Sequence, residues 1–416
     1  MEEDLLHVVD GHFGHLHTYR WVSIETMNVS PDDISNRSRS ILSVCHNRVD
    51  WFINFKMLRV LDLSSIFYGE LDLICDGLVL LRYLALTIDI VYGGVVEMRI
   101  LEKSFNLQIL VLLTLEERWE GFPIKLSQIW MPMLRHLQFS TMLMVDTPSV
   151  VQESLQTIYW LRPSQCTKEV FSRIPNAKVM GIFIPSWRWG EIVEDGSPWL
   201  DDLINLRKLE KLKINSHRGD PIILPLSSAF PEKLNIRMLT LKGTLVPWDA
   251  MEVVGMLPNL EVLKLKSRAC KGQHWELSGD WFPKLKSLLI QEMELKQWTA
   301  PDGAFPILER LIIKHCIHLG KIPSTFDELY SLQLIELYGC HSSLVRSAKR
   351  IKQQQEELLG NDWLVVHDYN TQICGSSSYP DSSYFARQIQ EEEDAKLTDV
   401  NFFNCFEDDF DHNDIN

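Results

Sequence analysis

LEVLKL at Leu260–Leu265 sets a pattern, L-x-x-L-x-L, that returns as LKSLLI (Leu285–Ile290), LERLII (Leu308–Ile313) and LQLIEL (Leu332–Leu337). The first leucines of these segments are 25, 23 and 24 residues apart. Ile replaces Leu at some of the pattern positions. A fixed period of this length predicts an architecture of stacked repeats rather than a single globular core.

The spacing within each segment indicates a short strand with one buried face, because its fourth and sixth positions alternate with polar residues. One repeat cannot enclose its own apolar side, so neighbouring repeats must stack. Burying each leucine contributes roughly 1.5–3 kcal/mol. We therefore predict an α/β fold, a leucine-rich-repeat solenoid (horseshoe) with parallel strands on its concave face.

Further segments extend the pattern towards the N-terminus. They are FKMLRVLDL (Phe55–Leu63), LRYLAL (Leu81–Leu86), LQILVL (Leu107–Leu112), LRHLQF (Leu134–Phe139), the weaker LQTIYW (Leu155–Trp160) and AKVMGIFI (Ala177–Ile184), LEKLKI (Leu209–Ile214) and IRMLTL (Ile236–Leu241). This predicts about twelve units between Leu58 and Leu337, spaced roughly 21–32 residues apart.

Four regions follow from the pattern. Residues 1–50 lack the repeat, residues 51–341 carry it, residues 342–370 form a C-terminal cap, and residues 371–416 form a disordered acidic tail. Ile34–Val44 is expected to be an edge element of the solenoid. Within the cap, the spacing of Leu344, Ala348, Ile351 and Leu358 predicts a helix over Ser342–Leu359, with Ser342 or Ser343 as its N-cap and Gly360 at its end.

Composition limits the class of protein. The formal net charge is −15 and the pI about 5.4, which argues against general nucleic-acid binding. The first residues, MEEDLLHVVDGHFGHLH, do not form a secretory signal, and no apolar run is long enough to span a bilayer. The cysteines are scattered without a C-x-x-C pair, which favours reduced thiols in a cytoplasmic protein. Peripheral membrane association stays open.

Two local clusters have an ordinary and a functional interpretation. His12, His15 and His17 could bind a metal, but no Cys or second His pair lies nearby, so surface or packed histidines are favoured and no metal site is predicted. Trp187, Trp189 and Trp199 lie in a long insertion, Pro185–Asp202. They could anchor a partner, but a local apolar cluster is favoured.

The predicted partner-binding surface is basic. The third, fifth and seventh positions of each L-x-x-L-x-L-x segment face out from the concave side. In the later repeats these positions carry Lys211, Lys213, Lys242, Lys264, Lys266, Arg310 and Lys314. We expect a continuous basic stripe able to dock an acidic protein surface. The alternative is that the lysines only keep an exposed strand soluble. Nucleic acid is not expected, because the stripe lacks interleaved aromatic residues.

Three segments together carry a family resemblance: FKMLRVLDL, FPILERLIIKHCIHLGKIPSTFDELYSLQLIELYGC and SAKRIKQQQEELLGNDWLVV. Cys316 and Cys340 occupy the ninth repeat position, where such repeats often place Asn or Cys to bond the turning backbone. Over about residues 34–370 the chain resembles the C-terminal leucine-rich-repeat region of plant intracellular immune receptors of the coiled-coil nucleotide-binding class. Within that class it is most similar to the late blight resistance proteins of nightshades.

The resemblance implies a non-enzymatic recognition and autoinhibition module. Its implied partner is a pathogen effector, a guarded host protein or the receptor's own nucleotide-binding domain, and binding would trigger the defence response. No G-x-x-x-x-G-K-[ST] loop is present, so no cofactor is expected in this chain, and ADP or ATP would belong to a missing upstream domain. The sequence is thus expected to be a fragment, a truncated product or a free-standing repeat protein.

No sequence signature of a catalytic site is present. The alternative function is a substrate-selecting leucine-rich-repeat subunit of a ubiquitin ligase, which would need an F-box-like helical segment within residues 1–50. That segment shows no Leu-Pro-rich helical pattern.

Overall fold

The computed structural model describes residues 7–9, 21–24, 39–43, 57–68, 78–88, 95–97, 101, 104–114, 124–127, 129–140, 143–185, 199–216, 234–279, 281–360 and 362–369. The chain divides into two units, Met1–Tyr369 and Asn370–Asn416. All described residues belong to the first unit. The predicted disordered tail over residues 371–416 therefore lies outside the described residues.

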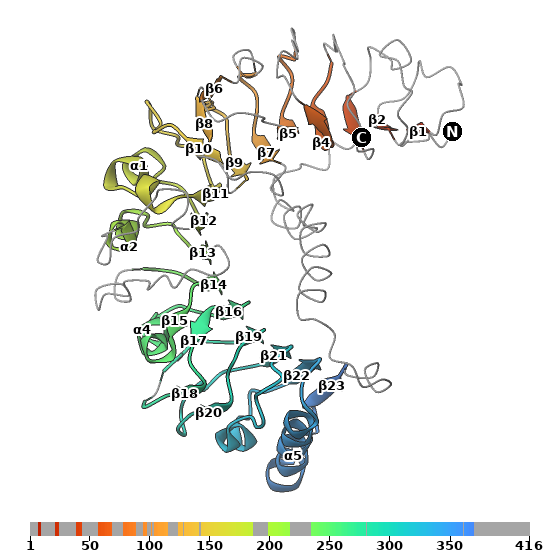
Figure 1. Ribbon diagram of the computed structural model, residues 1–416, viewed down its shortest axis with the longest axis vertical. Coiled ribbons are helices and arrows are strands. Elements are labelled where there is room, and N and C mark those ends of the chain that lie inside the picture. Colours follow the sequence, from red (N-terminus) through yellow and green to blue (C-terminus); the bar gives the residue numbers. More distant parts are fainter. Residues whose placement is uncertain are drawn as a thin grey trace. The chain divides into compact units, whose positions relative to one another are not determined.

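One parallel sheet runs through the first unit (Figure 1). Among the described residues it has 16 strands, which follow one another in chain order. They are β1 (His7–Val9), β2 (Trp21–Ile24), β3 (Ser40–Ser43), β4 (Val60–Tyr68), β5 (Tyr83–Ile88), β7 (Ile109–Thr114), β9 (His136–Phe139), β11 (Thr157–Leu161), β12 (Val179–Ile184), β13 (Lys211–Ser216), β14 (Met238–Lys242), β16 (Val262–Lys266), β19 (Ser287–Gln291), β21 (Arg310–Lys314), β22 (Leu334–Tyr338) and β23 (Val365–Asp368). Each L-x-x-L-x-L segment named above carries one of these strands, so the predicted parallel-strand solenoid is confirmed.

The pattern leucines form one continuous interior. The fourth-position residues Leu263, Leu288 and Leu311 are aligned on neighbouring strands and are fully buried. The first- and sixth-position residues belong to the same hydrophobic cluster, which extends from Ile41 to Leu364. Each strand thus turns one face to the shared core and its alternate residues to the opposite face, which we call the open face.

The sheet extends beyond the predicted N-terminal boundary of the repeats at residue 50. β3 pairs in parallel with β4, as expected for a strand within Ile34–Val44. However, β2 pairs with the other side of β3, and β1 pairs with β2. The expectation that Ile34–Val44 forms an edge was therefore wrong: β3 is an interior strand, although its flanking sequence lacks the leucine pattern.

Short elements return the chain from one strand to the next. Three small sheets contain β6 (Val95–Glu97), β8 (Ile124–Ser127) and β10 (Leu143–Val145), then β15 (Val246–Pro247) with β17 (Cys270–Lys271), and β18 (His274–Glu276) with β20 (Gln297–Thr299). The helices on this side are brief: α1 (Lys168–Arg173), α2 (Trp199–Asp202), α4 (Met251–Gly255), and the 3-10 turns η4 (Pro163–Gln165), η6 (Leu203–Asn205), η7 (Trp248–Ala250) and η8 (Ser324–Glu328). The described solenoid thus has few helices.

An aromatic ladder joins the later returns. Trp275 stacks between Trp248 and Trp298, with ring centroids 4.8 and 5.0 Å apart. Beside it, Phe282 stacks on Phe305 at 5.0 Å. All these rings are buried. Since aromatic pairs are worth about 0.5–1.5 kcal/mol beyond the area that they bury, the ladder links repeats through their side chains as well as through the sheet.

The predicted cap is present. Helix α5 spans Ser342–Leu359 and ends at Gly360, whose φ of 63° is left-handed, as expected. Its N-cap is His341 rather than Ser342 or Ser343, because the His341 side chain accepts a hydrogen bond from the Ser343 backbone N–H. On its buried face, Gln355 donates to the carbonyls of Phe326 and Leu329 at 2.9 and 3.1 Å. Polar atoms of the turn below the helix are thereby satisfied.

The ninth-position cysteines donate to the turning backbone, as the resemblance implied. The Cys316 thiol lies 3.7 Å from the Ile290 carbonyl, and the Cys340 thiol lies 3.4 Å from that of Ile313. Burial raises the pKa of Cys316 to about 12. A thiol that stays protonated can keep donating at neutral pH, so these cysteines serve as structural donors.

Candidate protein-binding surface

The register places all the predicted cations on the open face of the sheet. Along β13, β16 and β21, the buried pattern residues alternate with less buried ones, whereas in β14 the open-face Thr240 is buried as well. The less buried positions include Lys211, Lys213, Lys242, Lys264, Lys266, Arg310 and Lys314, which we call the open-face cations. The strand alternation read from the sequence is therefore confirmed for this surface.

The cations do not form the continuous stripe that was expected. Lys242 and Lys266 are neighbours across β14 and β16. The next strand, β19, contributes Ser287, Leu289 and Gln291 to the open face and thus no cation. The prediction was wrong here because Leu289 and Gln291 of β19 align with Lys264 and Lys266 of β16. The basic surface consists of one group on β13–β16 and a smaller one on β21.

Two of these lysines lie over aromatic rings. The Lys213 ammonium lies 5.0 Å from the centre of the Tyr159 ring, and the Lys314 ammonium lies 4.4 Å from that of Tyr338. Neither contact was predicted, and the expectation that the stripe lacks interleaved aromatic residues was wrong. The signal was a tyrosine and a lysine at open-face positions, one strand apart for Lys314 and Tyr338 and two strands apart for Lys213 and Tyr159. A cation over a ring face is attracted by the ring quadrupole.

At the open-face positions of the described strands from β13 to β22, the acidic residue is Glu336. Glu336 lies 3.8 Å from Arg310 and accepts a hydrogen bond from the Tyr338 hydroxyl at 3.1 Å. Burial, followed by the hydrogen bond and the charge of Glu336, raises the pKa of Tyr338 to about 12. The hydroxyl therefore stays neutral at physiological pH.

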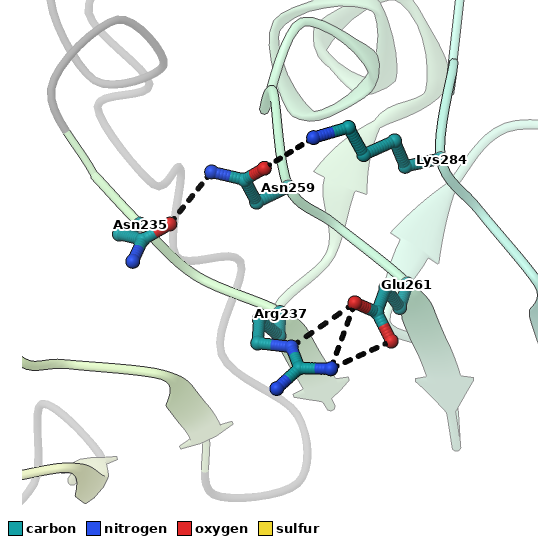
Figure 2. A network of polar contacts seen from close by, with 5 residues as sticks. All are labelled: Asn235, Arg237, Asn259, Glu261 and Lys284. Carbon is teal, nitrogen blue, oxygen red and sulfur yellow. Dashed lines mark hydrogen bonds and ion pairs between the residues drawn. The ribbon is translucent and has the colours of Figure 1, made fainter.

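A second polar arrangement lies at the strand-start edge, which we define as the turn before each strand together with the first residue after the leading leucine. Figure 2 shows its best-connected part. Asn259 donates to Asn235 and accepts from Lys284, both at 2.6 Å. Arg237 binds the two carboxylate oxygens of Glu261 at 3.0 and 3.1 Å. These contacts join successive repeats. In the Arg237–Glu261 pair, each charge is neutralised by the other.

The other predicted candidates fall largely outside the described residues. His12, His15 and His17 do so, as do Trp187 and Trp189. Trp199 begins α2, but its side chain is not described. The anchor-loop and histidine hypotheses therefore stay predictions.

The described part of the chain has no group of three or more His, Cys, Asp or Glu side chains placed to hold a metal ion. Within the same residues, no helix combines the length and the apolar character needed to cross a bilayer. The arrangement that the described residues do offer is a charged sheet face suited to binding another macromolecule.

A short part of the chain matches a family model. Residues 381–416 match the family described as small acidic protein 1/2. From the sequence this segment was predicted only as part of a disordered acidic tail. Phenylalanines lie among its acids, at Phe402, Phe403, Phe406 and Phe410.

Proteins of Solanum demissum resemble a larger part of the chain. The chain is 30% identical over 317 residues to late blight resistance protein homolog R1B-23 and 31% identical over 311 residues to homolog R1B-16. Each of these alignments covers 73% of this chain, which spans only 24% and 23% of the two relatives. Together with the repeat fold, these matches show that the chain is a distant homologue of the late blight resistance proteins of Solanum.

Proposed function

We propose that this chain is the recognition module of a plant disease-resistance protein and that its open-face cations dock an acidic protein surface. The observation that carries the proposal is the grouping of cations at open-face positions of three neighbouring strands, β13, β14 and β16. Lys242 and Lys266 are direct neighbours in this group. The homology supports the disease-resistance setting.

The surface is suited to steering and orienting a partner. A single exposed ion pair is worth about 0.2–1 kcal/mol, so binding strength would come from several pairs formed together and from apolar contacts. The same face supplies Met238, Val262 and Ile312 between the cations. Complementary charge mainly raises the association rate and fixes the register of a complex. Binding should therefore weaken as salt rises.

A protein suits this surface better than a nucleic acid. Stacking of bases needs exposed ring faces. Here the lysines at positions 213 and 314 lie over the rings of Tyr159 and Tyr338. The candidate partners are a pathogen protein, a host protein and a nucleotide-binding domain of the receptor class. Binding to such a domain would hold the receptor at rest, and a ligand would act by binding the resting and active arrangements with different affinity.

The test reverses charge on the open face. The full chain carries Lys213→Glu, Lys264→Glu and Lys266→Glu, and its binding to the remainder of homolog R1B-16, the part outside the matched region, is measured at about 50 and about 300 mM salt. A matched control reverses three exposed lysines away from the face, Lys271, Lys296 and Lys321. The net-charge change is the same in both variants.

We expect the open-face variant to bind at least tenfold more weakly at low salt, on the order of what several lost ion pairs would cost, and the control variant to bind like the unmodified chain. The unmodified chain should lose affinity on going to high salt. Equal binding by the two variants would contradict the proposal, because the location of the positive charge would then not matter.

A further inference from the structure

The C-terminal edge of the sheet presents backbone groups on its outer side. Among the described strands, β23 is the last in chain order and pairs on one side only, with β22. The backbone N–H groups of Val365 and Tyr369 donate to the carbonyls of Gln333 and Leu337 at 2.8 and 2.9 Å. In a parallel sheet, alternate residues of a strand turn both backbone groups to the same side. The N–H and carbonyl of Val366 therefore point away from β22, where the described residues place no strand.

This edge exposes apolar side chains and lacks the features that usually protect an edge strand. Val365 is 42% exposed and Tyr369 is 50% exposed. Natural edge strands are commonly blocked by lysine, by proline or by a bulge. β23 contains neither lysine nor proline, and its register with β22 continues without a shift. An unpaired edge of this kind is a template for a further strand.

The rows of side chains that cross the sheet define what a further strand must supply. On the core side, Val366 continues the row of Leu311 and Ile335, which are both fully buried. On the open face, Val365 continues a row in which Leu334 is its neighbour. Cross-strand neighbours that pack together stabilise a sheet. A strand added beside β23 would therefore carry apolar residues at both of these positions.

Two other open-face rows are polar and aromatic. His367 is aligned with Glu336, and an imidazole N–H can also donate to an acid on a further strand. The Lys314 ammonium lies 4.4 Å from the centre of the Tyr338 ring, and the Tyr369 ring stacks on Tyr338 with its centroid at the same distance. Because stacked rings attract one another, an aromatic residue on the further strand would extend this row over the exposed Tyr369.

We propose that β23 is a docking edge for an extended peptide, which joins the sheet as one more parallel strand. The peptide has the pattern apolar, apolar, acidic, any residue, aromatic, and it lies in register with residues 365–369. In this register Val366 donates to the carbonyl of the first peptide residue and accepts from the N–H of the third, acidic residue. The backbone bonds provide affinity, and the alternating side chains provide specificity.

A second copy of the chain is the other occupant that this edge could take. Two copies related by a two-fold axis would meet with their strands antiparallel. Centred on Val366, that arrangement would place Val365 opposite His367 and would interrupt the rows described above. A strand of four residues also buries far less than the roughly 1,200 Å² of a standard interface. Self-association is therefore an outcome of the test.

The experiment uses the full chain and a designed peptide, Val-Val-Glu-Ser-Tyr, which is flanked by serines, capped and labelled with fluorescein. Binding is measured by fluorescence anisotropy. One altered peptide carries a methyl group on the backbone nitrogen of its glutamate, which removes the N–H that would bond to Val366. Another carries lysine in place of the glutamate. Light scattering over the same range of protein concentration detects self-association.

Variants of the chain test the same contacts from the other side. Val366→Pro removes the outward N–H, and proline is tolerated on an edge strand where the N–H faces solvent. Its control, Val366→Ala, keeps the N–H. Tyr369→Ala removes the stacking ring, and its control, Tyr330→Ala, removes an exposed ring in the turn before β22. Circular dichroism and thermal unfolding identify any variant that fails to fold. The methylated peptide tests the backbone bonds with the unmodified chain.

We expect the unaltered peptide to bind the unmodified chain. Val366→Pro and the methylated peptide should each weaken binding about tenfold, because each removes one backbone hydrogen bond, and Val366→Ala should weaken it less. The lysine peptide and Tyr369→Ala should each weaken binding about threefold, whereas Tyr330→Ala should have no effect.

The proposal is overturned if the unaltered peptide does not bind at about 100 μM protein, or if the methylated peptide binds equally well. It is also overturned if folded Val366→Pro binds like Val366→Ala, if the lysine peptide binds equally, or if Tyr369→Ala binds like Tyr330→Ala. Self-association that Val366→Pro abolishes, without peptide binding, would assign the edge to a second copy instead. The open-face cations of β13, β14 and β16 are unchanged in every variant, so the result is independent of the function proposed above.

Discussion

The strand-start edge around β5 and the same edge around β16 have the same backbone and opposite chemistry. In both, the residue after the leading leucine bonds through its backbone N–H to the carbonyl of the residue one repeat earlier. Around β5 the side chains of this row are Arg59, Arg82 and Gln108. Around β16 they alternate in sign through Glu210, Arg237, Glu261, Lys286 and Glu309.

This difference shows how a repeat fold can assign separate tasks to equivalent positions. In the later region, neighbours of opposite sign satisfy one another, as Arg237 and Glu261 do, and amides and a lysine link the turns (Figure 2). In the early region the row carries arginines and Gln108 and no acid, and the turns expose apolar side chains. The later edge thus joins successive repeats through pairs of opposite charge, which the early row cannot form within itself.

The largest effect is expected from the aromatic ladder, which only the later region has among the described repeats. Trp275→Ala should destabilise the chain by about 3–5 kcal/mol, because the side chain is 1% exposed and two stacked rings would face a cavity. Urea unfolding followed by tryptophan fluorescence measures this. The early-region counterpart, Phe105→Ala, should change stability by less than about 0.5 kcal/mol. Equal effects on stability would mean that the aromatic ladder does not hold the later repeats together more strongly than the side chains of the early repeats do.

The next effect concerns the cap that closes the later region. Gln355→Leu should cost about 1–3 kcal/mol, because the carbonyls of Phe326 and Leu329 would lose their donor in a buried place. Amide hydrogen exchange in α5 should become faster, whereas the exchange rates around β5 should change less. Gln353→Leu, on the exposed side of the helix, is the matched control. Unchanged exchange in α5 would mean that the amide does not hold the cap.

Exchanging the two charge patterns should have smaller and opposite effects. Glu261→Arg removes the bidentate pair with Arg237 and creates a run of like charges, so we expect a loss of about 0.5–1 kcal/mol. Gln108→Glu places an acid between Arg82 and Arg135 in the early row and should be neutral or slightly stabilising. Thermal unfolding at low and high salt measures both. Loss of stability in both variants would show that the sign pattern is not what separates the regions.

The smallest effect is a pH dependence in the later region. Burial raises the pKa of Asp327 above its ordinary value of 3.8, although Arg350 at 3.7 Å acts in the opposite direction. The folded state therefore takes up this proton at higher pH than the unfolded state, and stability should fall as pH rises from 3.8 through the raised pKa. Asp327→Asn should flatten that part of the pH profile. A profile identical to that of the unmodified chain would contradict this assignment.

Much of the fold could be predicted because the repeat period and the strand alternation are local signals. Positions such as Leu263, Leu288 and Leu311 report one buried face, and the open-face cations follow from the same alternation. The helix Ser342–Leu359 was predicted with its observed bounds, because its apolar stripe and Gly360 mark both face and end. The His341 cap was missed because imidazole is an unusual N-cap, and its role depends on the local turn.

What could not be predicted depends on register between repeats of unequal length. The gap at β19 arises because Leu289 and Gln291 align with Lys264 and Lys266 of β16. That alignment depends on the pairing between strands of different repeats. The aromatic ladder has the same origin, since Trp248, Trp275 and Trp298 meet only after the intervening turns fold. Strands β1 and β2 lack the leucine pattern, so nothing in their local sequence indicated that they join the sheet.

The alternation of Glu210, Arg237, Glu261, Lys286 and Glu309 constrains how this stretch of the gene can change in length. Deleting or duplicating a single internal repeat would bring two residues of like sign to neighbouring strands. Removing or adding two repeats at once would restore opposite neighbours. Length variants of this region that keep the alternation should therefore differ by even numbers of repeats, a parity that the early row, with its arginines and glutamines, does not impose.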